Sequence, residues 1–255
     1  MFKRIGTAIL GIPLILIIIW LGGLPLSASL LLLGMIATSE YTKMLNLPKF
    51  KVGIPIAFFG FCLFFSSIPF HIIFFVYFFI IAVYLLIVNF HSEEINTLAY
   101  SLIPIPYIFL PFWLLGAIRQ QENGFIFLLI ILVIPWITDT GAYFVGLSVG
   151  KNKLLPSVSP KKTIEGALGG LFLCILFLVS ANYYLDILAF HEAFLFAFVG
   201  SILAQIGDLF ESALKRKCNI KDSGDILPGH GGILDRFDSL LFIAPFGYIF
   251  FKYFI

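Results

Sequence analysis

The chain has 255 residues, of which 60% are hydrophobic, 17% are aromatic and only 12% are charged. A soluble globular domain carries about a quarter charged residues, so this composition excludes an ordinary soluble fold and predicts a membrane protein. The net charge of +2 is too small to indicate a nucleic-acid-binding protein, and we expect no nucleic acid among the partners.

Apolar runs bounded by charged or turn residues follow one another along the chain, and each is long enough to form a membrane-crossing helix. The break between the third and fourth runs is the least distinct, because only the residues SSIPFH separate two Phe-rich stretches. We predict nine spans, at residues 5–22, 24–40, 52–69, 71–90, 97–118, 124–149, 166–185, 191–212 and 236–254.

Basic residues test this count, since Lys and Arg accumulate in cytoplasmic loops. With nine spans and a cytoplasmic N-terminus, fourteen of the sixteen Lys and Arg fall inside, and only Arg119 and Lys252 fall outside. We therefore expect an all-α polytopic membrane protein whose C-terminus lies outside. It divides into N-terminal transmembrane helices, 1–120 (spans one to five), and a catalytic transmembrane region, 121–255 (spans six to nine), with polar cytoplasmic loops 150–165 and 212–236.

Acidic side chains inside spans are costly, so each marks a candidate functional site. Asp139 lies 15 residues into the sixth span and Asp208 lies 17 residues into the eighth. At 1.5 Å per residue, these residues are about 22 and 26 Å below the outer face. Asp235 and Asp238 enter the ninth span from the cytoplasm. All four carboxylates are therefore expected near the inner end of the hydrocarbon.

Two interpretations of these carboxylates stay open. Grouped carboxylate oxygens suit a hard cation such as Mg²⁺, but salt bridges to Lys215, Arg216 and Arg236 would also neutralise them. Pro135 lies four residues before Asp139 and removes a helical hydrogen bond there. This pattern fits a polar cleft and a kinked packing helix equally well.

The first polar loop contains the stretch SVSPKKTIEG. Ser159 and Pro160 are in the favoured order for a helix N-cap and first turn, and Lys161 and Lys162 follow. We expect an anion site at this helix start, with contact to anionic lipid headgroups as the alternative. Just beyond, Gly166 and Gly170 form a small-xxx-small pair typical of helix packing.

The second polar loop contains the stretch PGHGG, whose glycines allow a backbone to approach a ligand closely. His230 in its centre has three possible roles: it could bind a phosphate, shuttle a proton or cap the turn. Basic residues precede the glycines and Asp235 follows them, which gives both halves of a nucleotide-triphosphate site. The residues concerned are Lys215, Arg216, Lys217, Lys221, Gly229, Gly231 and Gly232.

From Ser212 to Asp238 the sequence resembles the signature of the phosphatidate cytidylyltransferases, also called CDP-diacylglycerol synthases. The pattern is S-x-x-K-R-x4-K-D-x-G-x2-L-P-G-H-G-G-x-x-D-R-x-D, and the sequence does not depart from it. The stretches DTGAYFVG, SPKKTIEG and QIGDLFES also resemble blocks of that family. The resemblance covers the C-terminal half well, and the N-terminal half only as hydrophobic spans.

This resemblance implies an enzyme of the inner cell membrane that joins CTP and phosphatidic acid at its cytoplasmic face, giving CDP-diacylglycerol and pyrophosphate. It further implies a homodimer, contact with membrane lipids, and Mg²⁺ with a potassium ion, held by Asp208 and Asp235. From the loops, the spans and the resemblance together, we predict Asp208, Asp235, Lys215, Arg216 and His230 as catalytic residues. The predicted substrate-binding residues are Lys161, Lys162, Lys221, Asp222, Gly229, Gly231, Gly232, Arg236, Asp139 and Ser212.

Two other functions are compatible with parts of the sequence. A CTP-dependent polyprenol or phytol kinase would use similar loops but transfer the γ-phosphoryl group to an alcohol. An ion or substrate transporter would use Asp139, Asp208 and Asp235 as intramembrane sites. The absence of an internal sequence repeat and the two polar loops weigh against transport.

Overall fold

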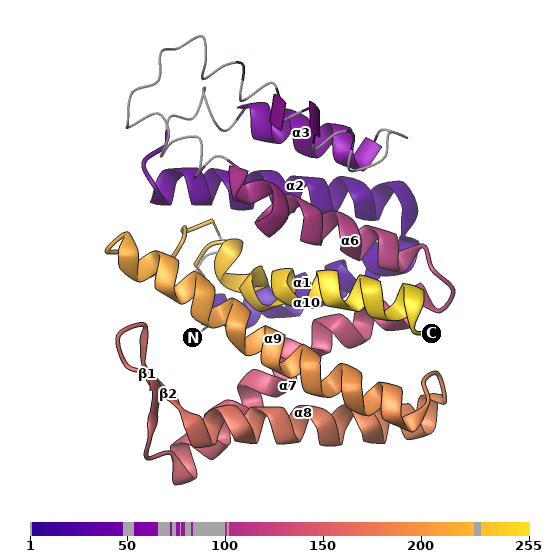
Figure 1. Cartoon of the computed structure of the whole chain (residues 1–255), viewed down its shortest axis with the longest axis vertical. Helices are drawn as coiled ribbons and strands as arrows, with labels where there is room; N and C mark the ends of the chain where they lie inside the picture. Colours follow the sequence, from indigo (N-terminus) through magenta and orange to yellow (C-terminus); the bar gives the residue numbers. More distant parts are fainter. Residues whose placement is uncertain are drawn as a thin grey trace. The chain divides into compact units, whose positions relative to one another are not determined.

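The computed structural model describes residues 2–47, 54–65, 102–226 and 231–255, together with positions 72, 75, 76, 78, 79, 83 and 100. These residues form two compact units: one comprises Met1–Gly116 and Ser223–Leu234, and the other comprises Ala117–Asp222 and Asp235–Ile255. The helices (Figure 1) are α1 Phe2–Leu21, α2 Gly23–Met44, α3 Ile54–Phe65, the π-helix η2 Ile105–Phe109, α6 Leu110–Arg119, α7 Gly124–Val149, α8 Ile164–Leu185, α9 Phe190–Lys217 and α10 Leu234–Tyr253.

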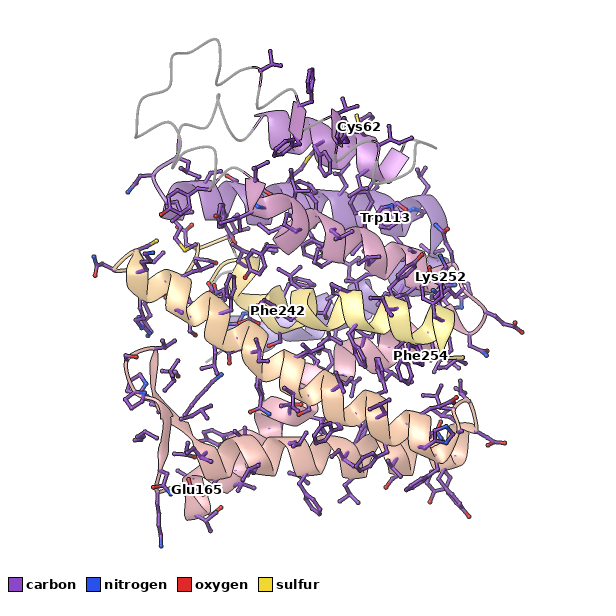
Figure 2. All side chains as sticks on the ribbon, viewed as in Figure 1. Cys62, Trp113, Glu165, Phe242, Lys252 and Phe254 are labelled. Carbon is purple, nitrogen blue, oxygen red and sulfur yellow. The ribbon has the colours of Figure 1, made fainter. Side chains whose placement is uncertain are left out.

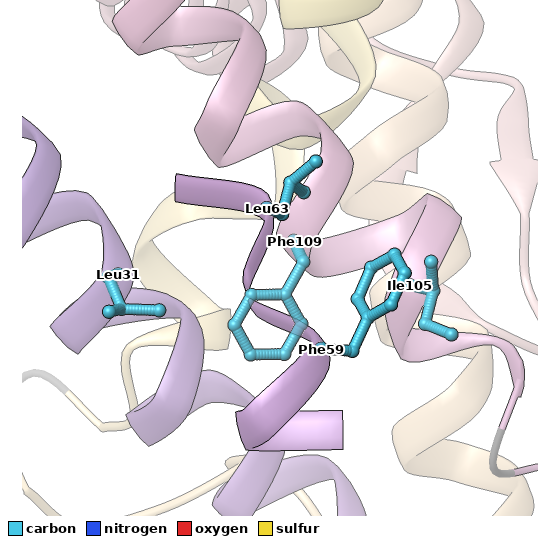
Figure 3. Packing of buried hydrophobic residues seen from close by; sticks show 5 residues of the cluster. All are labelled: Leu31, Phe59, Leu63, Ile105 and Phe109. Atoms are coloured by element: carbon cyan, nitrogen blue, oxygen red, sulfur yellow. The ribbon is translucent and has the colours of Figure 1, made fainter. Parts of the chain in front are cut away.

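The first unit has an apolar core where α2 and α3 pack against η2. Phe109 lies at its centre, and Figure 3 shows its ring among side chains from all three elements. Gly34 makes room for this ring, since a Cβ there would lie 3.0 Å from the Phe109 side chain. Lipid is as apolar as these side chains, so close packing holds such helices together more than exclusion from water does. The core residues are Leu31, Phe59, Leu63, Ile105 and Phe109.

The second unit is built on α7, α8 and α9, which lie side by side (Figure 1). Small residues bring the backbones of α7 and α8 together, as the Gly166 and Gly170 pair predicted. A Cβ on Gly170 would lie 2.5 Å from the carbonyl oxygen of Thr138, and one on Gly166 would lie 2.7 Å from that of Ala142. Thr138 also donates a 3.0 Å hydrogen bond to Ser201 Oγ, which joins α7 to α9.

A two-stranded antiparallel hairpin, β1 Lys153–Leu155 and β2 Ser159–Thr163, precedes α8. The expected helix start at Ser159 is therefore wrong. Thr163 is the N-cap, because its side chain accepts a 3.1 Å hydrogen bond from the amide of Gly166. Glu165, labelled in Figure 2, accepts hydrogen bonds from the amides of Lys151 and Asn152. Strand pairing across the loop thus overrides the local capping signal.

Four of the described helices are long and apolar enough to cross a membrane: α2, α7, α8 and α9. This confirms a largely helical membrane protein. The predicted span 71–90 lies mostly outside the described residues, as do parts of 52–69 and 97–118. Near the fifth span, Pro104 and Pro106 border or enter η2, where proline interrupts regular α-helical hydrogen bonding.

Replacing Gly170 by Ala is expected to lower the free energy of unfolding by about 1–3 kcal/mol, because the added methyl group overpacks the α7–α8 contact. Gly11→Ala is the matched control, since a Cβ at that helical glycine has no atom within 4 Å. Thermal unfolding of both purified variants in detergent measures the difference. Equal stability of the two would show that the glycine contact is unimportant.

Candidate active site

Aromatic contacts fix the directions of three helices in the second unit. The ring of Phe251, near the end of α10, stacks 4.0 Å from Phe127 at the start of α7 and lies 4.6 Å from Phe196 at the start of α9. At the other end of α10, Asp238 is so close to α9 that a Cβ on Gly207 would lie 2.6 Å from its carbonyl oxygen. The late residues of α9 therefore meet the early residues of α10.

We call the region where the end of α9 meets the start of α10 the polar end of the second unit. Asp208 of α9 lies there, and its carboxylate forms an ion pair with Lys162 of β2. Ser212, one helical turn further, donates a 3.3 Å hydrogen bond to the other carboxylate oxygen of Asp208. Three of the predicted site residues are thus in direct contact. The hairpin, rather than a helix start, carries the lysine to the carboxylate.

Lys215 forms the second ion pair of the polar end. Its ammonium group lies 2.6 Å from Asp235 Oδ1 and also contacts the carboxylate of Glu211, one helical turn earlier on α9. Glu211 is buried, with only 1% of its surface exposed. One buried cation therefore lies between two acidic groups and offsets part of the cost of burying them.

Two further carboxylates, Asp139 and Asp238, lie within electrostatic range of Asp208. Arg236 and Lys162 act on Asp139 with the opposite sign and so offset part of this repulsion. These three carboxylates of the second unit therefore influence one another, and their common depth in a membrane stays a prediction. The basic side chains of Lys162 and Arg236 lie close enough to offset part of this negative charge.

Arg216, predicted to be catalytic, makes two hydrogen bonds to main-chain carbonyl groups. Its Nε donates to Val158 at 3.3 Å and its Nη1 donates to Ile220 at 3.2 Å. The side chain thereby ties the turn of the β1–β2 hairpin to the end of α9. This contact positions the loop that carries Lys162.

The other predicted site residues have different surroundings. Gly231 has φ of +84°, a conformation that favours glycine, and Gly232 is buried. Gly229 and His230 lie outside the described residues. The predicted site residues with exposed side chains are Lys161, Lys221, Asp222 and Arg236, together with Asp139 and Arg216.

Sequence reasoning missed Glu40, an acidic residue that it took as the last residue of the second span. The helix α2 continues to Met44, so Glu40 lies within it, and only 1% of its surface is exposed. Its carboxylate accepts hydrogen bonds from the polar loop of the first unit, at Ser223, Ile233 and Leu234. An acidic residue at the end of an apolar run was the available signal.

Among the described residues, no group of three or more His, Cys, Asp or Glu side chains is arranged to hold a metal ion. Mg²⁺ commonly takes one or two carboxylates and completes its shell with water and substrate phosphates. Asp208 and Asp235 fit that mode in their donor atoms, since both offer carboxylate oxygens at the polar end of the second unit.

A protein-family model described as "Cytidylyltransferase family" matches residues 2–254. A Bacillus subtilis (strain 168) protein named "Phosphatidate cytidylyltransferase" is 46% identical over 129 residues, which cover 50% of this chain and 48% of that protein. Proteins of the same name from Staphylococcus haemolyticus and Staphylococcus aureus (strain COL) are 43% identical over 148 residues, or 58% of this chain and 56% of theirs. The matches thus span about half the length of these curated relatives.

Replacing Lys215 by Met is expected to destabilise the fold by about 3–5 kcal/mol, because Glu211 and Asp235 would lose their shared buried cation. Lys217→Met, at an exposed position of the same helix, is the control. Adding Glu211→Gln to Lys215→Met should restore part of the loss. Thermal unfolding in detergent tests this, and wild-type stability of Lys215→Met would contradict it.

Proposed function

The chain belongs to the cytidylyltransferase family, and from this premise we propose that it joins CTP and phosphatidic acid to give CDP-diacylglycerol and pyrophosphate in phospholipid biosynthesis. The substrates are proposed because its relatives are named phosphatidate cytidylyltransferases. The structural observation that carries it is the polar end of the second unit. There, Lys162 contacts Asp208 and Lys215 contacts Asp235, so groups for binding phosphates and groups for binding a cation are interleaved.

Asp208 and Asp235 are proposed to hold Mg²⁺, with potassium as a second ion. A bound divalent cation would neutralise charge on the phosphate oxygens of the nucleotide. Lys162 and Lys215 support this assignment, because they already bring positive charge to the two carboxylates. Triphosphate oxygens would compete with the carboxylates for these ammonium groups. The lysines would then bind phosphate while the carboxylates face the cation.

The proposed reaction is an in-line displacement at the α-phosphorus of CTP. A phosphate oxygen of phosphatidic acid forms the new P–O bond, the bond to the β-phosphate bridging oxygen breaks, and pyrophosphate leaves with the electron pair. A phosphate monoester is largely dianionic at neutral pH, so no strong general base and no protein nucleophile are required. The chain contributes mainly by orienting the two substrates and balancing their charge.

The basic and glycine-rich loops are proposed to bind the substrates around this centre. Lys215, Arg216 and His230 join the two aspartates as catalytic residues, and Arg216 supports the hairpin through its contact with Val158. The proposed substrate-binding residues are Lys161, Lys162, Lys221, Asp222, Gly229, Gly231, Gly232, Arg236, Asp139 and Ser212.

We also propose nine transmembrane helices, with a cytoplasmic N-terminus, a C-terminus outside, and a site facing the cytoplasm at the inner cell membrane. The bias of Lys and Arg supports this topology. Residues 1–120 would form the N-terminal transmembrane part and 121–255 the catalytic part. Homodimer formation and contact with surrounding lipids complete the proposal, which includes no nucleic acid partner.

Labelled CTP separates this function from its rivals. The purified full-length protein, supplied with Mg²⁺, phosphatidic acid and α-labelled CTP, is expected to form labelled CDP-lipid, whereas γ-labelled CTP should release its label as pyrophosphate. Transfer of the γ-label to polyprenol or phytol would instead identify a lipid kinase. Ion or solute uptake by proteoliposomes without nucleotide would favour a transporter.

Asp235→Asn is expected to reduce this turnover at least about a hundredfold, since it removes one of the two proposed carboxylate ligands. Asp225→Asn is the control, because Asp225 is exposed and is not part of the signature pattern. The rate of CDP-lipid formation as a function of Mg²⁺ concentration measures the effect. Unchanged Mg²⁺-dependent activity of Asp235→Asn would contradict the metal assignment.

Lys162→Ala is expected to raise the KM for CTP about tenfold, because it removes a charged contact from the phosphate side of the site. Lys161→Ala should have a smaller effect, since Lys161 is exposed whereas Lys162 contacts Asp208. Steady-state kinetics at saturating phosphatidic acid compares the two variants. Equal KM values for Lys162→Ala and the wild type would assign this lysine to structure alone.

A further inference from the structure

Glu40 places a buried carboxylate within α2, an apolar helix long enough to cross a membrane. A carboxylate in such surroundings is costly unless donors replace its lost hydration. The amides of Ile233 and Leu234 each donate a 2.9 Å hydrogen bond, one to each carboxylate oxygen. Ser223 Oγ donates a third, weaker hydrogen bond at 3.3 Å.

The two amides that bind Glu40 are at a helix start. Leu234 is the first residue of α10 and Ile233 directly precedes it. The first amides of a helix have no acceptor within the helix, and that end carries the positive pole of the helix dipole. Glu40 therefore caps α10, although it is 193 and 194 residues distant in the sequence.

Two glycines of the signature pattern pack against the same carboxylate. A Cβ on Gly224 would lie 2.7 Å from Glu40 Oε1, and one on Gly232 would lie 2.6 Å from Oε2. Any larger residue would displace the carboxylate from its donors. Ser223 and Ile233 thus bring two ends of the polar loop to one acidic group, which offsets part of the entropy cost of closing that loop.

We infer that Glu40 is a positioning residue for the proposed reaction: by capping α10 it fixes the backbone from which Asp235 extends. Asp235 directly follows Leu234 in the same helix, so fraying of this helix end would move its carboxylate. A displacement of about 1 Å can cost a hundredfold in rate when catalysis depends on orientation. The inference rests on the proposed cytidylyltransferase function and adds a residue outside the signature.

The test compares Glu40→Gln, Glu40→Asp, Ser223→Ala and, as a control, Glu122→Gln at an exposed position. Two readouts are measured on the full-length protein in detergent: kcat for CDP-lipid formation and hydrogen–deuterium exchange of peptides covering 231–238. In Glu40→Gln we expect kcat to fall about tenfold to a hundredfold and exchange in this segment to become at least about tenfold faster. Glu40→Asp keeps the charge, so its kcat and its exchange rate should lie between those of Glu40→Gln and the wild type. Ser223→Ala should lower kcat and speed exchange less than Glu40→Gln does.

Different results would reject the positioning role of Glu40 and the proposed cytidylyltransferase function. Wild-type kcat and wild-type exchange in Glu40→Gln would overturn the inference. It would also be overturned if exchange rose evenly along the chain and activity fell only with the folded fraction, because Glu40 would then be merely structural. Absence of CDP-lipid formation by the wild type would instead reject the function, while the local exchange readout would still test the helix cap.

Discussion

A carboxylate buried among apolar helices must be matched by positive charge or by hydrogen-bond donors, because neither lipid nor packed side chains replace the water that it has lost. The structure meets this requirement in two ways. Lys162 and Lys215 compensate Asp208, Glu211 and Asp235 with mobile side-chain charge. Backbone amides and a serine compensate Glu40 instead.

The two kinds of compensation suit different tasks. A lysine can leave its carboxylate when a phosphate offers stronger binding, so an ion pair of this kind can be exchanged during a reaction cycle. Backbone amides at a helix start cannot leave without breaking the helix, so their acceptor is permanent. The carboxylates proposed for chemistry have the exchangeable partners, and the carboxylate proposed for positioning has the fixed ones.

Sequence reasoning succeeded where a signal was local. The apolar run 124–149 coincides with α7, and the spacing of Gly166 and Gly170 correctly predicted helix packing. It failed where distant residues decide. The capping signal at Ser159 lost to pairing with β1, because the partner strand lies outside the local sequence that suggested the cap. The acceptor role of Glu40 depends on residues that are almost two hundred positions away.

This separation has a consequence for the order of folding. Glu40 is synthesised long before Ile233 and Leu234, so α2 must first tolerate an acidic group that lacks its final donors. The cap on α10 can form only once Ile233 and Leu234 have left the ribosome, which makes it a late and non-local step relative to the folding of α2. If Glu40 acts as inferred, a residue of the N-terminal half that belongs to no recognisable motif determines whether the start of α10, which carries Asp235, reaches its final conformation.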